Sequence, residues 1–503
     1  MYKNVMIYKK TSRYSKNFLL VCVNVKISDS AIKRKRRENM KKRMVYASQA
    51  GAVLDSNVLT GGGTDDTAAI QAVLDIAKDG TEGVYLVMDG AALVRGLKVY
   101  SNTTICCLDD TCGFFMAPHS GGPLIQNGNR VFNGDGIDCY ITLQGGTYNQ
   151  NCPEQERMIL YDDAATGFST YIAEEGKSSD WTVAFLFIGV RHVRITDVTI
   201  RDQCVYAAFF RNWRHVLCEN VFIDLPNKAH GTNQDGLHFH GPGQYLILRN
   251  IRGSSSDDFI ALGPDEEDRN ASISDVLIDG VELYGADQAI RMLCCSGGRL
   301  DRVTVKNVTG VYRSYGFFIN PFFNEGVKPG CGYGSIVIDT VNLKSEAIDY
   351  HYTEPFLFRV GGHVECLTLR NIQHSHPRDS RYLVDVGLRY CEDNRLPPDW
   401  DPETRVDSLV IDGINTYEDD SSSSPTEYVR VHSGSVQSLT VKNINIIRKN
   451  TCGCGGAIVH ICNDAKVKNL NIGDVYAEKV SAVLTDDSEN TGLVKMNNIC
   501  LVK

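Results

Sequence analysis

The 503-residue sequence predicts an all-β protein, a right-handed parallel β-helix (solenoid) with a short N-terminal capping helix. The first observation is composition, because 45 Gly against 14 Pro, with abundant Val, Ile, Asn and Asp, is typical of strands and turns. The second is a phrase of alternating hydrophobic and polar residues that recurs at intervals of roughly 23 to 42 residues, inside the range of solenoids. The third is that each copy is too short to hold a helix between its strands, which favours coils stacked about 4.8 Å apart.

Residues 1–45 form a basic extension that we expect to lie outside the solenoid. They hold 14 Lys and Arg against only Asp29 and Glu38, a surplus of 12 positive charges. Because the whole chain carries −9, residues 46–503 carry −21, and a body this acidic does not attract nucleic acid by its overall field. The basic run 33–37 therefore fits a solvated tail, or a start at Met40, better than a nucleic-acid patch.

The apolar run 18–23 behind this basic leader resembles the core of a signal peptide. It is short, it is interrupted by Asn24 and Lys26, and no small-residue cleavage site follows it. No apolar run reaches the roughly 18 residues that a membrane-spanning helix needs, so no membrane partner is expected. We expect a cytoplasmic protein, with secretion as the alternative, and interpret the 17 cysteines as reduced thiols at core and ladder positions.

Residues 64–77 predict a helix that covers the N-terminal end of the solenoid. Its apolar positions repeat at the spacing of one helix face: Ile70, Val73, Leu74 and Ala77. Asp65 and Asp66 precede the apolar stretch, and we interpret them as helix-capping residues rather than as catalytic carboxylates.

Residues 46–503 form a single solenoid domain in this interpretation. In each copy of the repeat, Asn or Asp and often a small residue interrupt the alternation, and these residues tolerate the left-handed conformation of a sharp corner. The copies lie at 193–200, 216–223, 246–251, 276–281, 303–308, 336–341, 367–372, 409–414, 439–444 and 467–472. Leucine-rich and propeller repeats are the alternatives, but their Leu-x-x-Leu-x-Leu and Trp-Asp phrases are absent from the sequence.

Three carboxylates fall on two neighbouring coils. Asp235 lies in Asn233-Gln234-Asp235-Gly236, and Asp257 and Asp258 lie in the corner 254–258 one coil later. Each motif alone fits turn chemistry, but three stacked carboxylates repel one another and raise at least one pKa. Two carboxyl groups in unlike environments are what glycosidic cleavage requires, one protonated and one ionised.

These motifs resemble glycoside hydrolase family 28, the polygalacturonases. Asn233-Gln234-Asp235-Gly236 looks like the family's Asn-Thr-Asp-Gly motif, and the stretch 257–262 looks like its Asp-Asp-Cys-Ile-Ala-Ile motif. The helix at 64–77 is similar to a Thr-Asp-Asp-Thr segment of bacterial pectin-lyase-like proteins, and Gly145-Gly146-Thr147-Tyr148 is similar to an early Gly-Gly-Thr-Trp coil. The resemblance covers roughly residues 50 to 345 and is specific at the two Asp motifs.

The resemblance implies an inverting hydrolase that acts on a carbohydrate. Asp257 would be the general acid, while Asp235 and Asp258 would hold and deprotonate the attacking water. Inversion implies a separation of roughly 6.5–9.5 Å between the acid and the base.

The sequence departs from the family where the sugar is gripped. Gln288, within 287–291, stands where polygalacturonases carry the His of Gly-His-Gly, and 318–320 stands in place of their Arg-Ile-Lys. Arg291 could replace one of the lost cations, or the substrate could be a neutral galactoside. The predicted substrate-binding residues are Asn233, Gln234, His238, His240, Asp287, Gln288, Arg291, Phe318 and Asn320.

Other polar and aromatic stretches surround the cluster. His238 and His240 alternate on one strand and so share a face, where they either bind a sugar or have a structural role. The aromatic run 312–323 fits core stacking and sugar docking equally. The acidic loop 265–268 fits a solvated turn better than the rim of a cleft. The pair Cys452 and Cys454 lacks a second pair at zinc spacing, so no metal site and no cofactor are predicted.

Three functions remain open from the sequence. The first is a glycoside hydrolase that cleaves α-linked galacturonide-like or galactoside oligosaccharides or polysaccharides. The second is a polysaccharide lyase or epimerase, which would depend on calcium, and the third is a non-catalytic β-helix that binds glycans, as tailspikes and adhesins do. The three carboxylates favour the hydrolase, whereas the missing Arg-Ile-Lys keeps the other two open.

Overall fold

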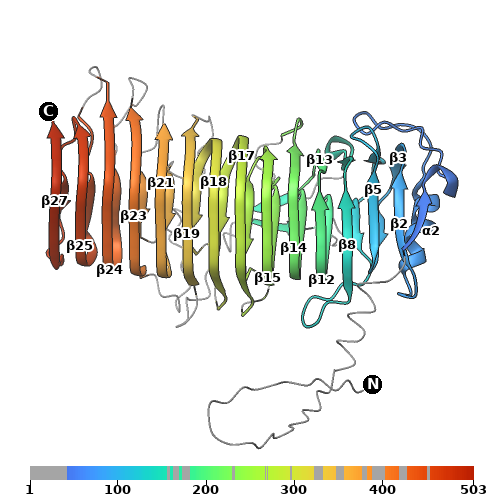
Figure 1. Cartoon of the computed structure of the whole chain (residues 1–503), viewed down its shortest axis with the longest axis horizontal. Helices are drawn as coiled ribbons and strands as arrows, with labels where there is room; N and C mark the ends of the chain where they lie inside the picture. Colours follow the sequence, from blue (N-terminus) through green and yellow to red (C-terminus); the bar gives the residue numbers. More distant parts are fainter. Residues whose placement is uncertain are drawn as a thin grey trace, which may run out of the picture.

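The computed structural model describes residues 42–155, 182–228, 233–266, 268, 270–294, 297–321, 332–346, 356–375, 382–387, 403–418, 427–449 and 454–503, and the backbone of 159–162 and 169–172. The chain forms a parallel β-helix whose strands stack along one long axis (Figure 1). Among the described residues, twenty-five strands belong to one sheet in which every pairing is parallel, and two short strands pair antiparallel. Within the described residues, no helix is long and apolar enough to cross a membrane.

The N-terminal half is built from short elements. They are β1 (Lys42–Tyr46), a 3₁₀ turn (Ser48–Ala50), α2 (Thr67–Leu74), a 3₁₀ turn (Asp75–Ala77), β2 (Gly83–Met88), β3 (Ala91–Val94), β4 (Leu97–Val99), β5 (Thr103–Cys107), β6 (Gly113–Met116), β7 (Ile125–Asn127), β8 (Asp138–Gln144), β9 (Thr147–Asn149), a 3₁₀ turn (Cys152–Glu154), β10 (Ile159–Asp162) and β11 (Ser169–Ile172).

Longer strands, most of which bend at a corner, make up the rest of the solenoid. They are β12 (Phe185–Thr196), β13 (Thr199–Arg201), β14 (Ala208–Asp224), β15 (Leu237–Gly253), β16 (Asp258–Gly263), β17 (Ser272–Met292), β18 (Arg299–Ile319), β19 (Gly332–Ser345), β20 (Phe356–Val360), β21 (His363–Ser375), β22 (Tyr382–Val386), β23 (Arg405–Glu418), β24 (Glu427–Arg448), β25 (Val459–Glu478), β26 (Leu484–Asp486) and β27 (Leu493–Val502).

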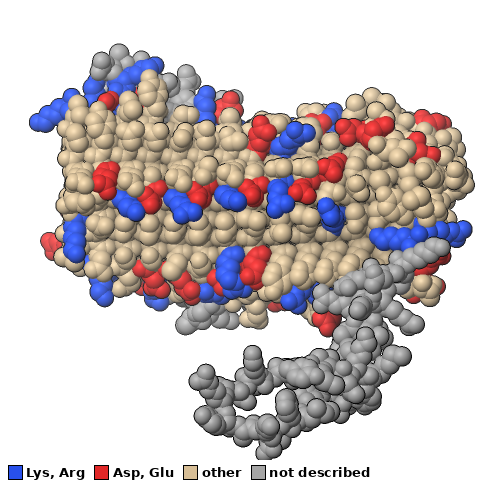
Figure 2. Space-filling model, in the orientation of Figure 1, with Lys and Arg blue, Asp and Glu red and all other residues tan. Residues whose placement is uncertain are grey.

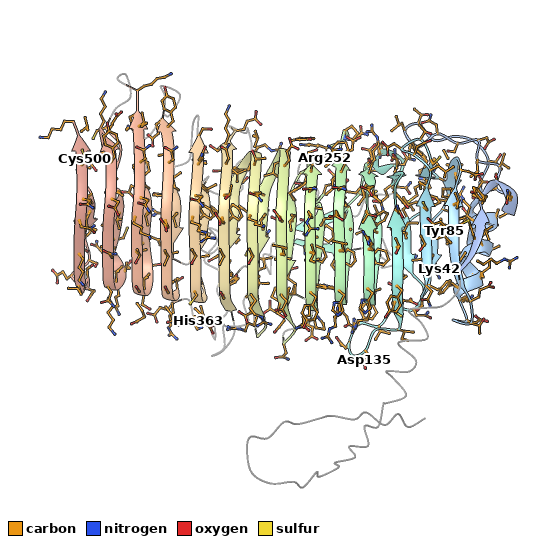
Figure 3. The ribbon with its side chains drawn as sticks, in the orientation of Figure 1. Lys42, Tyr85, Asp135, Arg252, His363 and Cys500 are labelled. Carbon is orange, nitrogen blue, oxygen red and sulfur yellow. The ribbon has the colours of Figure 1, made fainter. Side chains whose placement is uncertain are left out.

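The solenoid begins inside the predicted basic extension, because β1 pairs in register with β2 from Lys42↔Gly83 to Tyr46↔Val87. Lys42 and Tyr85 therefore lie at one end of the molecule, and Cys500 lies at the other end (Figure 3). The boundary predicted at residue 46 is late by the length of this strand. The basic run 33–37 and Met40 lie outside the described residues.

The capping helix α2 covers the N-terminal end, as predicted, with Ile70, Val73, Leu74 and Ala77 all buried. The predicted capping role is wrong for Asp66. Asp66, at the N-cap position, makes no side-chain cap bond, and its carboxylate instead accepts hydrogen bonds from the backbone N–H groups of Val53 and Leu54 at 2.7 and 2.9 Å. Asp65 Oδ1 accepts a hydrogen bond at 3.0 Å from the backbone N–H of Thr67, the first residue of the helix, and its carboxylate pairs with Arg95 at 3.0 Å. Asp65 therefore binds the N-terminal end of the helix, as predicted, whereas Asp66 ties it to the chain at Val53 and Leu54.

One residue per coil turns the corner in a positive-φ conformation, and these residues stack into what we term the corner column. Its members are Asp197, Asn220, Asn250, Gly280, Asn307, Thr340, Asn371, Gly413, Asn443 and Asp474. Asparagine amides bridge successive coils, as in Asn220 Nδ2 to Asp197 Oδ1 at 2.8 Å and Asn250 Nδ2 to Asn220 Oδ1 at 3.0 Å. Gly145 and Gly146, in the predicted Gly-Gly-Thr-Tyr coil, also have positive φ at a corner.

The copy predicted at 467–472 is out of register. Leu439 pairs with Leu470 and Ile444 with Val475, so the true copy is 470–475 and its corner is Asp474, not Asn471. Asn471 lies between Leu470 and Ile472, so the predicted register also places an asparagine between apolar residues.

The residue just before each corner from Asn220 to Asn443 carries a charge whose sign alternates from coil to coil. This charge column consists of Glu219, Arg249, Asp279, Lys306, Asp339, Arg370, Asp412 and Lys442. Its ion pairs are Arg249–Glu219 at 3.0 Å, Lys306–Asp279 at 3.0 Å, Arg370–Asp339 at 2.7 Å and Lys442–Asp412 at 3.1 Å. Alternating acidic and basic side chains run across the sheet face in Figure 2.

Stacked Val, Ile, Leu and Phe side chains fill the interior along the whole axis. Among the described cysteines, all of which are free thiols, many are buried as predicted, and burial raises the pKa of Cys218 to about 12. Cys366, Cys454 and Cys500 are exposed, so the prediction of core positions fails for these three.

Candidate active site

The three predicted carboxylates come together at the start of two neighbouring strands. β15 and β16 pair from Leu237↔Ile260 onward, and the backbone N–H of Gly236 donates to the carbonyl of Asp258 at 2.9 Å. Asp235 therefore lies beside Asp258 on the next coil, as the spacing of the motifs predicts.

These carboxyl groups differ in exposure, but the pKa of each is raised above its usual value. Asp235 and Asp258 are 1% and 3% exposed, whereas Asp257 is half-buried. Burial, followed by the charge of Asp257, holds the pKa of Asp235 well above its usual range. Burial also holds the pKa of Asp258 well above its usual range, although Arg291 opposes the shift. Burial raises the pKa of Asp257 to about 6, with Arg291 again opposing it. The cluster therefore holds at least one proton near neutral pH.

Asp258 has the most hydrogen-bond donors around it. Arg291 Nη1 lies 3.3 Å from Asp258 Oδ2, and the Tyr315 hydroxyl donates to Asp258 Oδ1 at 3.2 Å. With its amide nitrogen turned toward the carboxyl groups, Gln288 donates to Asp258 and to Asp257 Oδ1, the latter at 2.8 Å. Such donors favour the ionised form of Asp258 and so oppose the effect of its burial. Gln288 reaches the cluster from the position that the sequence assigns to the family's histidine.

Asp287 lies at the edge of the cluster in an ion pair with Arg313. Arg313 Nη2 also donates to the carbonyl of Ser255 at 3.3 Å. This link fixes the corner that carries Asp257 to the two coils that follow it.

Two predicted substrate-binding residues are structural instead. Gln234 is completely buried, donates to the carbonyl of Gln203 at 2.9 Å and accepts from Ser256 Oγ at 3.1 Å. Asn320 is 1% exposed and donates to the carbonyl of Pro321 at 2.9 Å. Asn233 is half-buried, and its amide donates to the Tyr206 hydroxyl at 3.0 Å.

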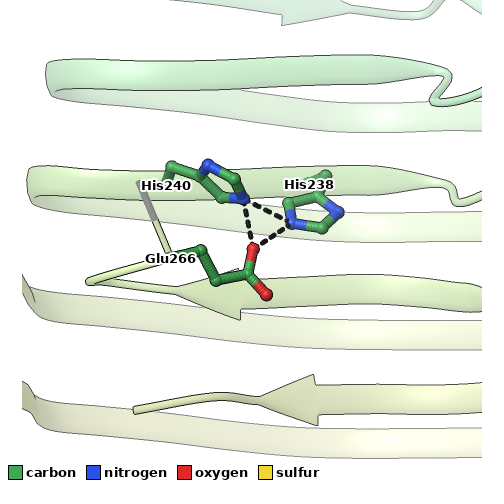
Figure 4. Close-up of side chains that lie close together, drawn as sticks. All are labelled: His238, His240 and Glu266. Atoms are coloured by element: carbon green, nitrogen blue, oxygen red, sulfur yellow. Dashed lines mark hydrogen bonds and ion pairs between the residues drawn. The ribbon is translucent and has the colours of Figure 1, made fainter. Parts of the chain in front are cut away.

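His238 and His240 share a face of β15, as predicted, and both contact Glu266 (Figure 4). His238 Nδ1 lies 2.7 Å from Asp235 Oδ2, so the histidine pair is continuous with the carboxyl cluster. The solvated turn predicted for 265–268 is wrong for its first two residues. Asp265 is 2% exposed, and Glu266 bonds to the two histidines.

Arginines and aromatic rings continue along the same face from the cluster. The Arg291 guanidinium lies 5.4 Å from the centre of the Phe318 ring, and Phe318 is 8% exposed between Tyr315 and Phe356. Phe318 pairs with Arg359 on β20, and Arg359 pairs with Asp385 at 2.9 Å. The described residues of the aromatic run are thus packed, and Phe322 and Phe323 lie outside the described residues.

Sequence reasoning missed Glu266, Tyr315, Arg359 and Asp385. Of these four residues, only Arg359 could have been expected from the repeat. It lies one coil after Phe318, and Phe318 stands in the stretch that replaces the family's Arg-Ile-Lys. Cys452 lies outside the described residues, so the thiol pair remains a sequence observation.

No family model matches the chain. A polygalacturonase of Persea americana is 23% identical over 155 residues, which are 25% of this chain and 33% of that protein. The chain thus spans about a third of the length of the curated relative that it matches. Activity and substrates therefore do not transfer from that protein as a whole.

Solved structures of low identity share the fold. A mutant tailspike protein of E. coli bacteriophage HK620, in complex with a hexasaccharide, has a TM-score of 0.57 at 10% identity, over 96% of this chain and 83% of that one. An exopolygalacturonase of Thermotoga maritima has a TM-score of 0.48 at 13% identity, over 94% of this chain and 96% of that one. The chain is polygalacturonase-like in sequence and has the parallel β-helix fold of the pectin-lyase-like proteins.

Proposed function

We propose that the protein is an inverting glycoside hydrolase that cleaves α-linked galacturonide-like or galactoside oligosaccharides or polysaccharides. The observation that carries this proposal is the meeting of Asp235, Asp257 and Asp258 from two stacked coils, with shared protons and unequal access to solvent. Glycoside hydrolysis by inversion needs one carboxylic acid and one carboxylate on opposite sides of the scissile bond.

Asp257 is the proposed general acid. It is the half-buried member of the cluster, so a substrate can approach it, and a pKa raised to about 6 keeps it largely protonated below that pH. Its proton passes to the glycosidic oxygen as the bond to the anomeric carbon breaks. A water held by Asp235 and Asp258 attacks that carbon, and its proton passes to this carboxylate pair. Gln288 orients Asp257 and Asp258 through its amide.

Arg291 is the proposed contact for an acidic sugar. It lies against both Asp258 and the Phe318 ring, where a uronate could accept a charge-assisted hydrogen bond beside the reacting carbon. A neutral galactoside would not need this contact. We also propose a cytoplasmic location with small imported oligosaccharides as substrates, which finding the mature protein outside the cell would contradict.

A panel of pectic and galactoside oligosaccharides, tested with the wild type and with Asp257→Asn, examines the proposal. The wild type should release reducing ends, and the variant should be slower by roughly 10²–10⁴-fold because it has no acid to protonate the leaving group. Proton NMR of the first product should report the inverted anomer.

Other outcomes would assign another function. An unsaturated or inverted uronate that forms only with calcium would indicate a lyase or epimerase. Glycan binding without turnover by either protein would indicate a binding β-helix, and equal turnover by both proteins would remove Asp257 from the chemistry.

A further inference from the structure

Two histidines and one glutamate point their ligand atoms at one spot beside the carboxyl cluster (Figure 4). His238 and His240 are two apart on β15 and therefore project from the same face of the strand. Glu266 comes from the turn that follows β16, one coil further on. The three ligand atoms lie within 4.8 Å of one another.

The three ligand atoms lie close enough together for one small ion to reach all of them. His238 Nε2 lies 2.9 Å from His240 Nε2 and 3.2 Å from Glu266 Oε2, and His240 Nε2 contacts the same glutamate oxygen. Ligand atoms about 2.0–2.1 Å from a tetrahedral zinc ion lie about 3.3–3.4 Å apart. Only a slight outward relaxation would therefore admit the ion.

The surroundings hold both rings in the orientation that a metal needs. His238 Nδ1 lies 2.7 Å from Asp235 Oδ2, and in the tautomer in which Nδ1 donates this hydrogen bond, Nε2 of that ring is the ligand atom. Tyr206 stacks on His238 with ring centres 4.3 Å apart, and the edge of His240 meets Phe209 at 4.8 Å. His238 and His240 are 5% and 3% exposed, so the site is shielded from bulk water.

We propose that His238, His240 and Glu266 bind a divalent transition-metal ion, with Zn²⁺ as the best fit, leaving one coordination position open. Imidazole nitrogen and a single carboxylate select such an ion over Ca²⁺, which prefers an all-oxygen shell. The ion would tie the turn after β16 to β15. Through His238 it would also hold the hydrogen bond to Asp235, which makes His238 a positioning residue for the carboxyl cluster. The proposal rests on this geometry and not on the hydrolase assignment.

The test uses the full chain, stripped with a chelator and titrated with Co²⁺ and Zn²⁺ without any substrate. The wild type should bind one Co²⁺ whose visible spectrum shows nitrogen and oxygen ligands, and Zn²⁺ should displace it. Glu266→Gln and His240→Asn should lose this spectrum. Asp235→Ala should keep it but bind about 10–100-fold more weakly, because it removes only the hydrogen bond behind the ligand.

His215→Asn is the matched control. His215 also stacks on a neighbouring ring, at 4.7 Å from Tyr245, and lies on the adjacent strand β14 without a carboxylate ligand set among the described residues. It should bind Co²⁺ as the wild type does. Binding that survives Glu266→Gln, or a spectrum dominated by sulfur-to-cobalt charge transfer, would overturn the proposal, since the ion would then sit on exposed thiols such as Cys454. If a protein without glycoside hydrolase activity binds one Co²⁺ per chain, the proposed metal site is supported and only the proposed hydrolase activity is contradicted.

Discussion

The pKa values of single residues in the carboxyl cluster predict how the rate of glycoside cleavage depends on pH. The acid form must be present for catalysis, and burial raises the pKa of Asp257 to about 6. The rate of glycoside cleavage should therefore fall as the pH rises above about 6, because the proton that the leaving group needs is lost. The pH profile of kcat/KM checks this, and a rate that keeps rising to pH 8 would contradict it.

The same shift has a consequence for stability. A carboxyl whose pKa is higher in the folded state stabilises the fold at low pH, and that contribution is lost as the pH rises through about 6. Asp257→Asn should therefore raise the free energy of unfolding at pH 7–8 by about 1–3 kcal/mol, with little change at pH 4. Urea unfolding of both proteins at the two pH values measures the difference. Equal curves at pH 8 would mean that the carboxyl is solvated in the folded protein.

The proposed contact between Arg291 and an acidic sugar can be tested by substitution. Arg291→Gln removes a charged donor, and a hydrogen bond to a charged group contributes about 1.5–3 kcal/mol. For an oligogalacturonide, kcat/KM should fall at least about tenfold further than for a galactoside of the same length. An equal loss for both substrates would indicate that Arg291 acts only on Asp258, which it contacts at 3.3 Å.

What the sequence could predict at this scale depends on how far apart the partners lie along the chain. Asp235, Asp257 and Asp258 were predictable because a local motif sets each one and the coil length stacks them. Glu266 was not, because its partners His238 and His240 become neighbours only after the chain passes through β16 and its turn. Gln234 was misassigned because its motif says nothing about burial, which the coil above it decides.

The corner column is the element whose stability is easiest to test. Asn443 has φ 56° and bonds Asp412 Oδ1 at 2.6 Å. Asn443→Ala should destabilise the protein by about 1–2 kcal/mol, because alanine pays for the left-handed conformation and also loses the hydrogen bond. Asn443→Gly should cost only about 0.5 kcal/mol, since glycine keeps the conformation. Urea midpoints measure both, and equal losses would show that the hydrogen bond dominates.

The charge column predicts a salt-dependent effect of a single reversal. Arg370→Glu would place an acid between Asp339 and Asp412 and should cost about 1 kcal/mol at low salt. Arg370→Gln should cost less, because it removes attraction without adding repulsion. About 1 M NaCl should shrink the difference between the variants, as it screens exposed charges beyond roughly 3 Å. Urea is the denaturant to use, since guanidinium chloride is itself a salt. If the difference in stability between the two variants does not change with salt, packing rather than charge is its cause.

Elements were predictable to the extent that their corners are marked. Asn or Gly at a corner follows from the backbone conformation that the corner demands, so ten copies could be found and nine of them lie in the register that the structure has. The tenth slipped because two asparagines flank Leu470. The capping helix was found from its apolar face and the hydrogen bond of Asp65 to Thr67 from its place before the helix, whereas Asp66 binds Val53 and Leu54, which no local pattern identifies.

Across the whole molecule, net charge should oppose long acidic polymers. Residues 46–503 carry −21, while the arginines near the cluster form only a local positive region. The initial rate on dilute polygalacturonate should therefore rise when NaCl is raised from about 10 to about 150 mM, because salt screens the repulsion. The rate on a neutral oligosaccharide is the control and should stay constant. A rate on the polymer that falls with salt would mean that a positive groove dominates the approach.

The alternating signs of the charge column bear on how the chain finds its native stacking. Corner residues repeat every coil, so they would accept a coil that stacked on its next-but-one neighbour. The charges repeat only every second coil, so the same error would set Glu219 against Asp279 and Arg249 against Lys306. Stacking that skips a coil therefore brings like charges together, whereas correct stacking brings opposite charges together. The charge column thus distinguishes odd-numbered from even-numbered coils, which the rest of the repeat does not. Removing two adjacent coils should therefore disturb the alternation of charge less than removing one coil.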